Sequence, residues 1–290
     1  MSNLQNLRLG GVPEHYNFAF HLPRTIEHWR DLGLDVQWTD FPAGTGAMVS
    51  ALNDGALDAA TLLTEGAVKA IHEGANIEIY SRFVDSPLEW GVHVRADHPA
   101  TDATGLVHPR IAISRFGSGS HLMACVMART LGWKPDALHF VLVESLQGAR
   151  AAFAADEADV FLWERYTTKP VVDSGEWKRI GVVTTPWPPF CLAIRKDKMD
   201  YAPALASAPR QTLREIDGET ARRFIAARYD LELDDVRAWW SKTRWNLSTD
   251  VRSAVLLATG ALLDAGQLPE AMSGDITATA DARRMVRARC

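Results

Sequence analysis

The chain has 290 residues, of which 47% are hydrophobic and 23% are charged, and its formal net charge is −5. This composition is typical of a globular protein with two domains of ordinary size. No apolar run reaches the roughly 20 residues that a membrane-spanning helix needs, so we do not expect a membrane-embedded protein. Basic and acidic residues are mixed along the chain, which argues against nucleic acid as a partner.

The cysteines and the N-terminus exclude further classes. Cys125, Cys191 and Cys290 are far apart and form no spacing suited to zinc, so we expect neither a metal site nor a cofactor. The first residues lead into a strand without the basic and apolar segments of a secretory signal. The sequence as written therefore predicts a cytoplasmic protein, or a periplasmic one whose signal was removed from this sequence.

Strands and helices alternate over the first two-thirds of the chain, which predicts an α/β fold with mostly parallel sheets flanked by helices. In the first series we expect strands at 7–10, 35–39, 59–63 and 77–83, and helices around 26–29, 45–54 and 65–73. In the second series we expect strands at 110–114, 139–143 and 159–163, and helices at 118–132 and 146–155. From Met199 onward the pattern is helical, with helices expected at 233–240 and 250–265.

The two series repeat one pattern, because Ala51–Asp58 resembles Ala152–Asp159, with an aspartate before a short strand in each. Extended segments with alternating apolar residues follow each series, at 89–95 and 190–195. We therefore expect two lobes joined by two crossover hinge strands. Lobe one spans 1–90 plus 190–290 with the C-terminal helices, lobe two spans 96–185, and the hinge lies near 91–95 and 186–194.

A Gly-rich turn joins a strand to a helix in each series, where the ligands of open α/β sheets bind. The first contains Gly44, Thr45 and Gly46, and the second contains Arg115, Phe116, Ser118, Gly119, Ser120 and His121. The first turn of a helix offers unpaired N–H groups and partial positive charge, which glycine makes accessible. With hydroxyl donors and an arginine nearby, these turns predict binding of a carboxylate, sulfonate or phosphate. The same residues also suit plain turns and helix caps.

Further candidates for ligand contact follow other expected strands: Glu14, His15, Asn17, Thr64, Glu65, Trp90, Trp163 and Glu164. The tryptophans would stack on a flat ligand. Glu65 would also suit a helix start, and Glu164 would also pair with Arg165. The glutamates equally suit an amine or a protonated ring nitrogen, so the ligand's charge stays open between these alternatives. Neither turn has a nucleotide-binding motif.

These segments resemble the substrate-binding proteins of nitrate, sulfonate and taurine ABC importers. Their type II periplasmic-binding-protein-like fold also includes the Thi5/NMT1-like proteins. The resemblance rests on Val36–Gly44, Ala51–Asp58, Arg110–Ser114 and Ala151–Asp159, and it covers about Leu7 to Arg195. It implies a monomer whose lobes close on a small-molecule ligand in the cleft between them, without catalysis. Gly44, Thr45, Gly46, Thr64, Glu65, Ser118, Gly119 and Ser120 are the cleft residues it implies, and an ABC permease is the partner it implies for an exported chain.

An enzyme of the same fold is the alternative. By the same resemblance, Thi5-like pyrimidine synthesis needs a cysteine-rich iron motif and a lysine for pyridoxal phosphate. The chain has no cysteine cluster, and we expect Lys69 on a solvated helix face. A desulfinase needs a nucleophilic cysteine, whereas we expect Cys125 in mid-helix and Cys191 in a crossover strand. Sequence alone leaves acid–base work by His15, His121 or the glutamates open, because it depends on geometry.

Overall fold

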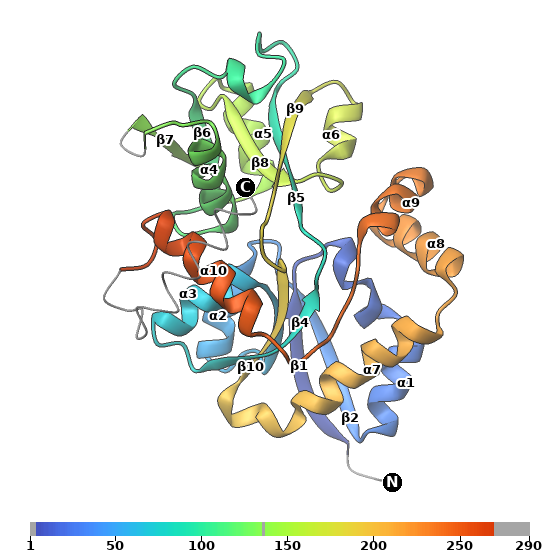
Figure 1. The fold of residues 1–290 in the computed structure, drawn as a ribbon. Helices are drawn as coiled ribbons and strands as arrows, with labels where there is room; N and C mark the ends of the chain where they lie inside the picture. Colours follow the sequence, from blue (N-terminus) through green and yellow to red (C-terminus); the bar gives the residue numbers. More distant parts are fainter. Residues whose placement is uncertain (1–3, 135–136, 270–290) are drawn as a thin grey trace. The chain divides into compact units, whose positions relative to one another are not determined.

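Two five-stranded sheets organise the residues that the computed structural model describes, which are 4–134 and 137–269. The chain divides into two units with one sheet each, and Figure 1 labels their elements. Among the described residues, unit 1 contains 4–86 and Pro188–Val255, and unit 2 contains 87–134, 137–187 and 256–269. Cys290 lies outside the described residues.

The sheet of unit 1 has the order β2-β1-β3-β10-β4. Its strands are β1 (Gln5–Gly11), β2 (Leu34–Asp40), β3 (Ala59–Leu63), β4 (Ile77–Val84) and β10 (Phe190–Arg195). β1 pairs in parallel with β2 and β3, while β10 runs antiparallel to both of its neighbours. The connections contain η1 (His15–His21), α1 (Pro23–Asp31), α2 (Thr45–Asn53) and α3 (Thr64–His72).

The sheet of unit 2 repeats this arrangement in the order β7-β6-β8-β5-β9. Its strands are β5 (Glu89–Arg95), β6 (Arg110–Ile113), β7 (His139–Leu142), β8 (Val160–Glu164) and β9 (Trp177–Thr184). β5 runs antiparallel to β8 and β9, as β10 does in the other sheet. The connections contain η2 (Ala103–Gly105), α4 (Gly119–Thr130), α5 (Leu146–Ala154) and α6 (Lys169–Asp173).

The two segments expected to be crossovers are interior strands, each within one sheet. In β5 and β10 every residue between the polar ends is buried, including His93. The period-two pattern of 89–95 therefore does not mark one exposed face, because strands packed between neighbours and covered on both faces are buried throughout. The sequence did not predict β9 or α6.

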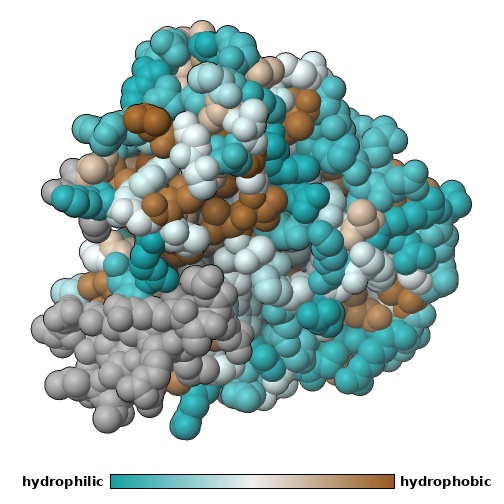
Figure 2. Space-filling view, turned by 45° about the horizontal axis from the view of Figure 1, so that its top comes forward, coloured by the Kyte–Doolittle hydropathy of each residue, from teal (hydrophilic) through white to brown (hydrophobic). Residues whose placement is uncertain are grey.

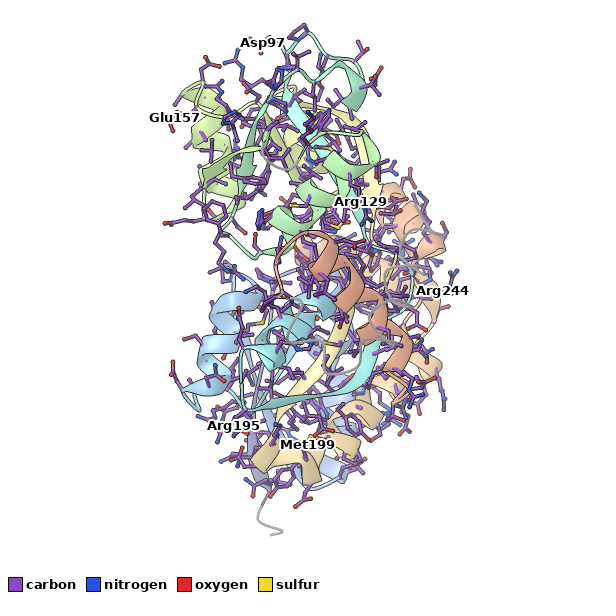
Figure 3. All side chains as sticks on the ribbon, turned by 60° about the vertical axis from the view of Figure 1, so that its left-hand side comes forward. Asp97, Arg129, Glu157, Arg195, Met199 and Arg244 are labelled. Carbon is purple, nitrogen blue, oxygen red and sulfur yellow. The ribbon has the colours of Figure 1, made fainter. Side chains whose placement is uncertain are left out.

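The C-terminal part is helical, with η4 (Lys196–Tyr201), α7 (Ala202–Glu215), α8 (Gly218–Tyr229), α9 (Leu233–Lys242) and α10 (Arg252–Asp264). α7 packs against α1 in unit 1. The predicted lobe one takes in all residues after 190, whereas the described residues 256–269 belong to unit 2. There Asp264 forms an ion pair with Arg129 of α4 (Figure 3). No described helix combines the length and apolar character needed to cross a membrane.

Candidate functional site

The predicted site residues lie at one edge of each sheet, where the parallel strands have their carboxyl ends. In unit 2 the turn after β6 leads into α4, and in unit 1 the turns after β2 and β3 lead into α2 and α3. β10 and β5 run in the opposite direction, so Arg195 and Asp97 mark the other edge of each sheet in Figure 3. The carboxyl edges are therefore where ligand contacts are expected.

Ser118 and Ser120 build the N-terminus of α4. Ser118 is its N-cap, and its hydroxyl accepts a hydrogen bond from the N–H of His121 at 3.3 Å. The hydroxyl of Ser120 accepts from the N–H of Ser114 at 2.9 Å and lies 3.0 Å from that of Ser118. Both serines are almost fully buried. Their hydroxyls thus hold the turn, and a direct contact with a ligand stays a prediction.

The backbone of this turn keeps donors available. In the described part of the chain no acceptor is placed at the N–H groups of Gly119 and Ser120, the first two residues of α4. A helix begins with such unpaired N–H groups, and its dipole adds partial positive charge there. Gly117 has φ +74°, which lets the chain turn tightly into the helix. The start of α4 is therefore suited to an anionic oxygen.

His121 carries its proton on Nε2. Its Nδ1 accepts a hydrogen bond from the N–H of Gly117 at 2.9 Å and lies 3.0 Å from the Nε2 amide nitrogen of Gln267. Both partners are donors, so Nδ1 must be the unprotonated nitrogen of a neutral ring. The ring edge also meets Phe140 at a centroid distance of 4.6 Å. His121 therefore stabilises the turn before α4 through its hydrogen bond with Gly117.

Arg115 supplies positive charge beside α4. Its carbonyl accepts from the N–H of Ser118 at 3.2 Å, which closes the turn. Its guanidinium is half-buried, and it forms no ion pair with any carboxylate of residues 4–134 and 137–269. Burial lowers the pKa of Arg115 from its ordinary value, although an arginine remains charged at neutral pH. Phe116, the next residue, is 62% exposed, and its ring meets that of His121 at a centroid distance of 5.4 Å.

Glu164 and the neighbouring tryptophans face the interior of unit 2. The Oε2 atom of Glu164 accepts from the N–H groups of Tyr166 at 2.9 Å and Thr167 at 2.6 Å. Burial raises the pKa of Glu164 to about 7. Trp90 is buried and meets the half-buried Trp163 edge to face at 6.2 Å. These residues shape the edge of the sheet.

The alternative that pairs Glu164 with Arg165 meets a competing carboxylate. The guanidinium of Arg165 instead contacts the carboxylate of Glu89 at 2.9 Å, because the start of β5 lies beside the end of β8. The Oε2 atom of Glu164 is occupied by backbone donors.

In unit 1, Thr45 connects two of the predicted turns. It is the first residue of α2, and its hydroxyl accepts from the N–H of Leu63 at 3.3 Å, just before Thr64 and Glu65 open α3. Gly44 has φ +75°, and a Cβ on Gly66 would come within 2.5 Å of the Thr45 side chain. Gly46 is half-buried, and Thr64 and Glu65 are buried. The two turns are thus packed together.

The loop after β1 is held by its own side chains. Asn17 donates from Nδ2 to the carbonyl of Val12 at 2.8 Å and accepts at Oδ1 from Thr61 at 2.9 Å. His15 is buried against Trp239 at a centroid distance of 4.3 Å, and burial lowers its pKa to about 3. Glu14, at the N-cap of η1, is half-buried. His15 therefore stays neutral at ordinary pH, which argues against a cationic role.

Glu144 lies at the same edge of the unit 2 sheet, although the sequence did not predict it as a site residue. Glu144 follows β7 with φ +62°, an uncommon conformation for a residue other than glycine, and its side chain is exposed. Its N–H donates to the carbonyl of Ser114 at 3.1 Å, which ties it to the turn before α4. No cue in the sequence predicts positive φ at a glutamate.

The cysteines are poorly suited to nucleophilic chemistry. Burial raises the pKa of Cys125 to about 11 and that of Cys191 to about 12, so both thiols stay protonated at neutral pH. A nucleophilic cysteine needs the opposite shift. Lys69 forms an ion pair with Glu73 one turn along α3. Within the described ranges, no group of three His, Cys, Asp or Glu side chains is placed to hold a metal ion.

Comparisons with known proteins agree with this architecture. A family model described as Ca3427-like PBP matches residues 90–183, within unit 2. The solved structure of the conserved Candida albicans CA3427 gene product is similar over 97% of this chain and 95% of that chain, with 24% identity and a TM-score of 0.83. It is described as defining a new family with the generic periplasmic binding protein fold. No curated protein matches in sequence.

The structures of two anion-binding proteins are also similar. The alkanesulfonate-binding protein SsuA from Xanthomonas axonopodis pv. citri, bound to MOPS, is 21% identical over 93% of this chain and 96% of that chain, with a TM-score of 0.76. The periplasmic nitrate-binding protein NrtA from Synechocystis PCC 6803 is 15% identical over 99% and 88%, with a TM-score of 0.72. The predicted fold class, and the resemblance to nitrate- and sulfonate-binding proteins on which it was based, are confirmed.

Proposed function

Starting from the type II periplasmic-binding-protein fold, we propose that this protein binds a small anionic organic solute and serves as the solute-binding component of an ABC importer. The observation that carries the proposal is that Arg115, which has no carboxylate partner in the described ranges, lies in the turn before α4, where the N–H groups of Gly119 and Ser120 have no acceptor among the described residues. Cation and dipole act in the same direction there, because both favour an anionic oxygen.

The solute class follows from the same residues. Planar guanidinium and backbone N–H groups suit a sulfonate or carboxylate, and the exposed ring of Phe116 in the same turn offers an apolar contact. SsuA and NrtA, which share the fold, bind an alkanesulfonate and nitrate, so anion binding has precedent in this architecture. A pyrimidine-like ring bearing an acidic group is the third class in the proposal.

The predicted cleft between two lobes, with closure near 91–95 and 186–194, stays part of the proposal. So does the participation of the unit 1 turns around Thr45 and Thr64. For an importer, the chain must also reach the side of the membrane from which solute is taken up. If fractionation of cells finds the protein in the cytoplasm, the same binding would serve a sensor or carrier instead of a permease.

The test is a thermal-shift screen with sulfonates, carboxylates, nitrate and pyrimidines, followed by calorimetry on any class that raises the melting temperature. A ligand that binds only the native state raises it with concentration. Arg115→Gln should weaken binding about tenfold or more, because it removes a charge-assisted contact. Arg30→Gln is the matched control, since Arg30 is an exposed helical arginine of unit 1.

The variant Thr45→Trp tests separately whether the α2 turn of unit 1 takes part in ligand binding. Loss of binding in this variant, with folding retained, would support a contribution of the α2 turn. Saturable binding that Arg115→Gln leaves intact would contradict the α4 site. Absence of a shift with every class would contradict anion binding as a whole. The desulfinase alternative has no support from Cys125 and Cys191, because both thiols are held protonated.

A further inference from the structure

Unit 1 contains a groove that is lined by none of the predicted site residues. It has a volume of about 440 Å³ and is lined by residues of α7 and of the segment that joins α9 to α10. Figure 1 shows where these elements lie in unit 1. Its polar lining includes Arg210 and Arg214 of α7, and Ser248 and Thr249 of the joining segment. This volume lies within the range of small-molecule pockets in proteins.

The walls of the groove are fixed by bonds to the rest of unit 1. The joining segment continues the sheet beyond β4: the N–H of Asn246 donates to Phe83 at 3.1 Å, and the carbonyl of Ser248 accepts from Arg82 at 2.9 Å. The indole N–H of Trp245 donates to the carbonyl of Tyr16 at 3.1 Å. A cavity between such elements exists before any ligand arrives, so binding does not have to order it first.

Two positive charges in the groove are not neutralised by the described residues. Arg210 and Arg214 lie one turn apart on the same face of α7, a spacing at which like charges repel. Arg210 donates to the carbonyl of Leu247, and neither arginine pairs with a carboxylate within residues 4–134 and 137–269. In the same unit, Arg8, Arg24 and Arg195 each have an acidic partner.

The nearby carboxylates have other partners. Glu215 is next to Arg214 in sequence, but its carboxylate accepts from Gln211 at 2.8 Å and lies 3.2 Å from both Arg24 and His28. Adjacent helical residues face different directions, so Glu215 does not point along the Arg210–Arg214 face. Asp85 accepts from Asn246 at 2.6 Å and lies 3.4 Å from Arg82, which balances its charge.

We propose that this groove binds a phosphate monoester, with the dianionic phosphate between Arg210 and Arg214 and the organic body against Trp245. Guanidinium groups match phosphate oxygens in pairs, and two of them match the charge of a dianion. The hydroxyl groups of Ser248 and Thr249 add donors at the same wall. Trp245 is half-buried and lines the groove beside the two cations, so it offers apolar surface to the body of the ligand.

The test is calorimetric titration of the full chain with phenyl phosphate, inorganic phosphate and benzoate. In the Arg115→Gln variant, whose α4 turn has lost its arginine, phenyl phosphate should bind with one site per chain and more tightly than benzoate, which has the ring but a single charge. Arg214→Gln should weaken phenyl phosphate at least about tenfold, because it removes a charge-assisted contact from an exposed side chain. Arg30→Gln, an exposed arginine on α1, should leave the affinity unchanged.

Two more variants separate this groove from the proposed solute site. Arg115→Gln should leave phenyl phosphate binding intact, and loss of binding in that variant alone would assign the ligand to α4 and overturn the groove proposal. Arg210→Lys keeps the charge but not the planar fork, so it should bind more weakly than wild type and more tightly than Arg210→Gln. Equal affinity in wild type and Arg214→Gln, or no saturable binding, would also overturn it.

Discussion

The carboxylate of Asp58 holds Arg8 at three points. It accepts from the backbone N–H at 2.9 Å, from Nε at 3.1 Å and from Nη2 at 2.8 Å. Asp159 holds Arg110 in the same way in unit 2, at 2.7, 3.0 and 2.6 Å. In each unit the arginine lies in the strand that starts a series and the aspartate precedes the third strand. The arginine–aspartate pair links the first and third strands of each series. This link gives the aspartate that recurs in the sequence repeat its structural role.

Asp58→Asn should lower the free energy of unfolding by about 2 kcal/mol, because a buried carboxylate is replaced by an amide that cannot accept all three bonds. Burial alone would raise the pKa of Asp58, but the hydrogen bonds and charge of Arg8 outweigh it, so the pKa lies below the ordinary value. The difference from wild type should therefore shrink as the pH falls through the folded-state pKa. Urea denaturation of wild type and Asp58→Asn at neutral and acid pH measures the loss of stability and its dependence on pH.

The matched control for that variant is Asp97→Asn, which breaks the exposed ion pair with Arg95. It should produce no measurable loss, because exposed pairs contribute little. A comparable loss in both variants would show that the threefold contact of Asp58 has no special role.

Ser120→Ala should destabilise the protein by about 2 kcal/mol. It removes the acceptor of the Ser114 N–H inside a buried turn, and an unsatisfied buried donor costs about that much. Ser50→Ala, at an exposed serine that contacts Asp54, should change stability far less. Thermal and urea unfolding decide this, and equal effects would mean that water replaces the Ser120 hydroxyl at the turn.

Glu164→Gln should stabilise the protein at pH 8 by an amount on the order of 2 kcal/mol. Folded Glu164 keeps its proton up to about pH 7, whereas an unfolded glutamate loses it near about pH 4.3. Its stabilising contribution is thus complete below the unfolded-state pKa and is lost as the pH rises through 7. Glutamine is neutral at every pH and can still accept from Tyr166 or Thr167, so it avoids this loss.

The measurement is the free energy of unfolding of wild type and Glu164→Gln between pH 4 and 8. The two curves should diverge as the pH rises. Glu157→Gln, at an exposed glutamate after α5 (Figure 3), should follow the wild-type curve. Parallel curves for Glu164→Gln and wild type would contradict the raised pKa.

Gly148→Ala should destabilise unit 2 by roughly 3 kcal/mol, the upper end for overpacking. A Cβ at this position in the first turn of α5 would lie 1.8 Å from the carbonyl oxygen of Val143, so the backbone would have to move. At Gly181 of β9 a Cβ would meet its nearest neighbours at 3.7 Å. Gly181→Ala should therefore leave stability unchanged or raise it slightly. Unfolding curves of the two variants give the comparison.

Exposed apolar side chains are the feature whose role the fold alone does not explain. Figure 2 shows hydrophobic groups gathered on a surface that is otherwise mostly hydrophilic, and the large exposed ones in unit 2 include Val107, Phe116 and Leu142. Of these, Phe116 lies within the turn that we assign to anion binding, and Leu142 pairs with Ile113 just before it. The sequence shows that Phe116 follows Arg115, but the exposure of the Phe116 ring depends on how the turn packs.

The sequence by itself determined the local elements. The expected strand at 59–63 has the bounds of β3, and the expected helices at 45–54 and 118–132 contain α2 and α4 with small differences at their ends. These elements follow from apolar periodicity and from turn residues such as Gly44 and Gly117, whose positive φ is a property of a few neighbouring residues. The repeated aspartate before β3 and β8 was readable for the same reason.

Only the tertiary structure decided how those elements combine. β5 and β10 became interior antiparallel strands, and β9 joined a sheet edge, because strand order depends on pairing between segments far apart in the chain. At the site, Glu164 and the hydroxyl of Ser120 turned out to bind backbone N–H groups, while Arg115 kept its charge unpaired by the described residues. A side chain at a strand end has several partners within reach, and the packed neighbours select one of them.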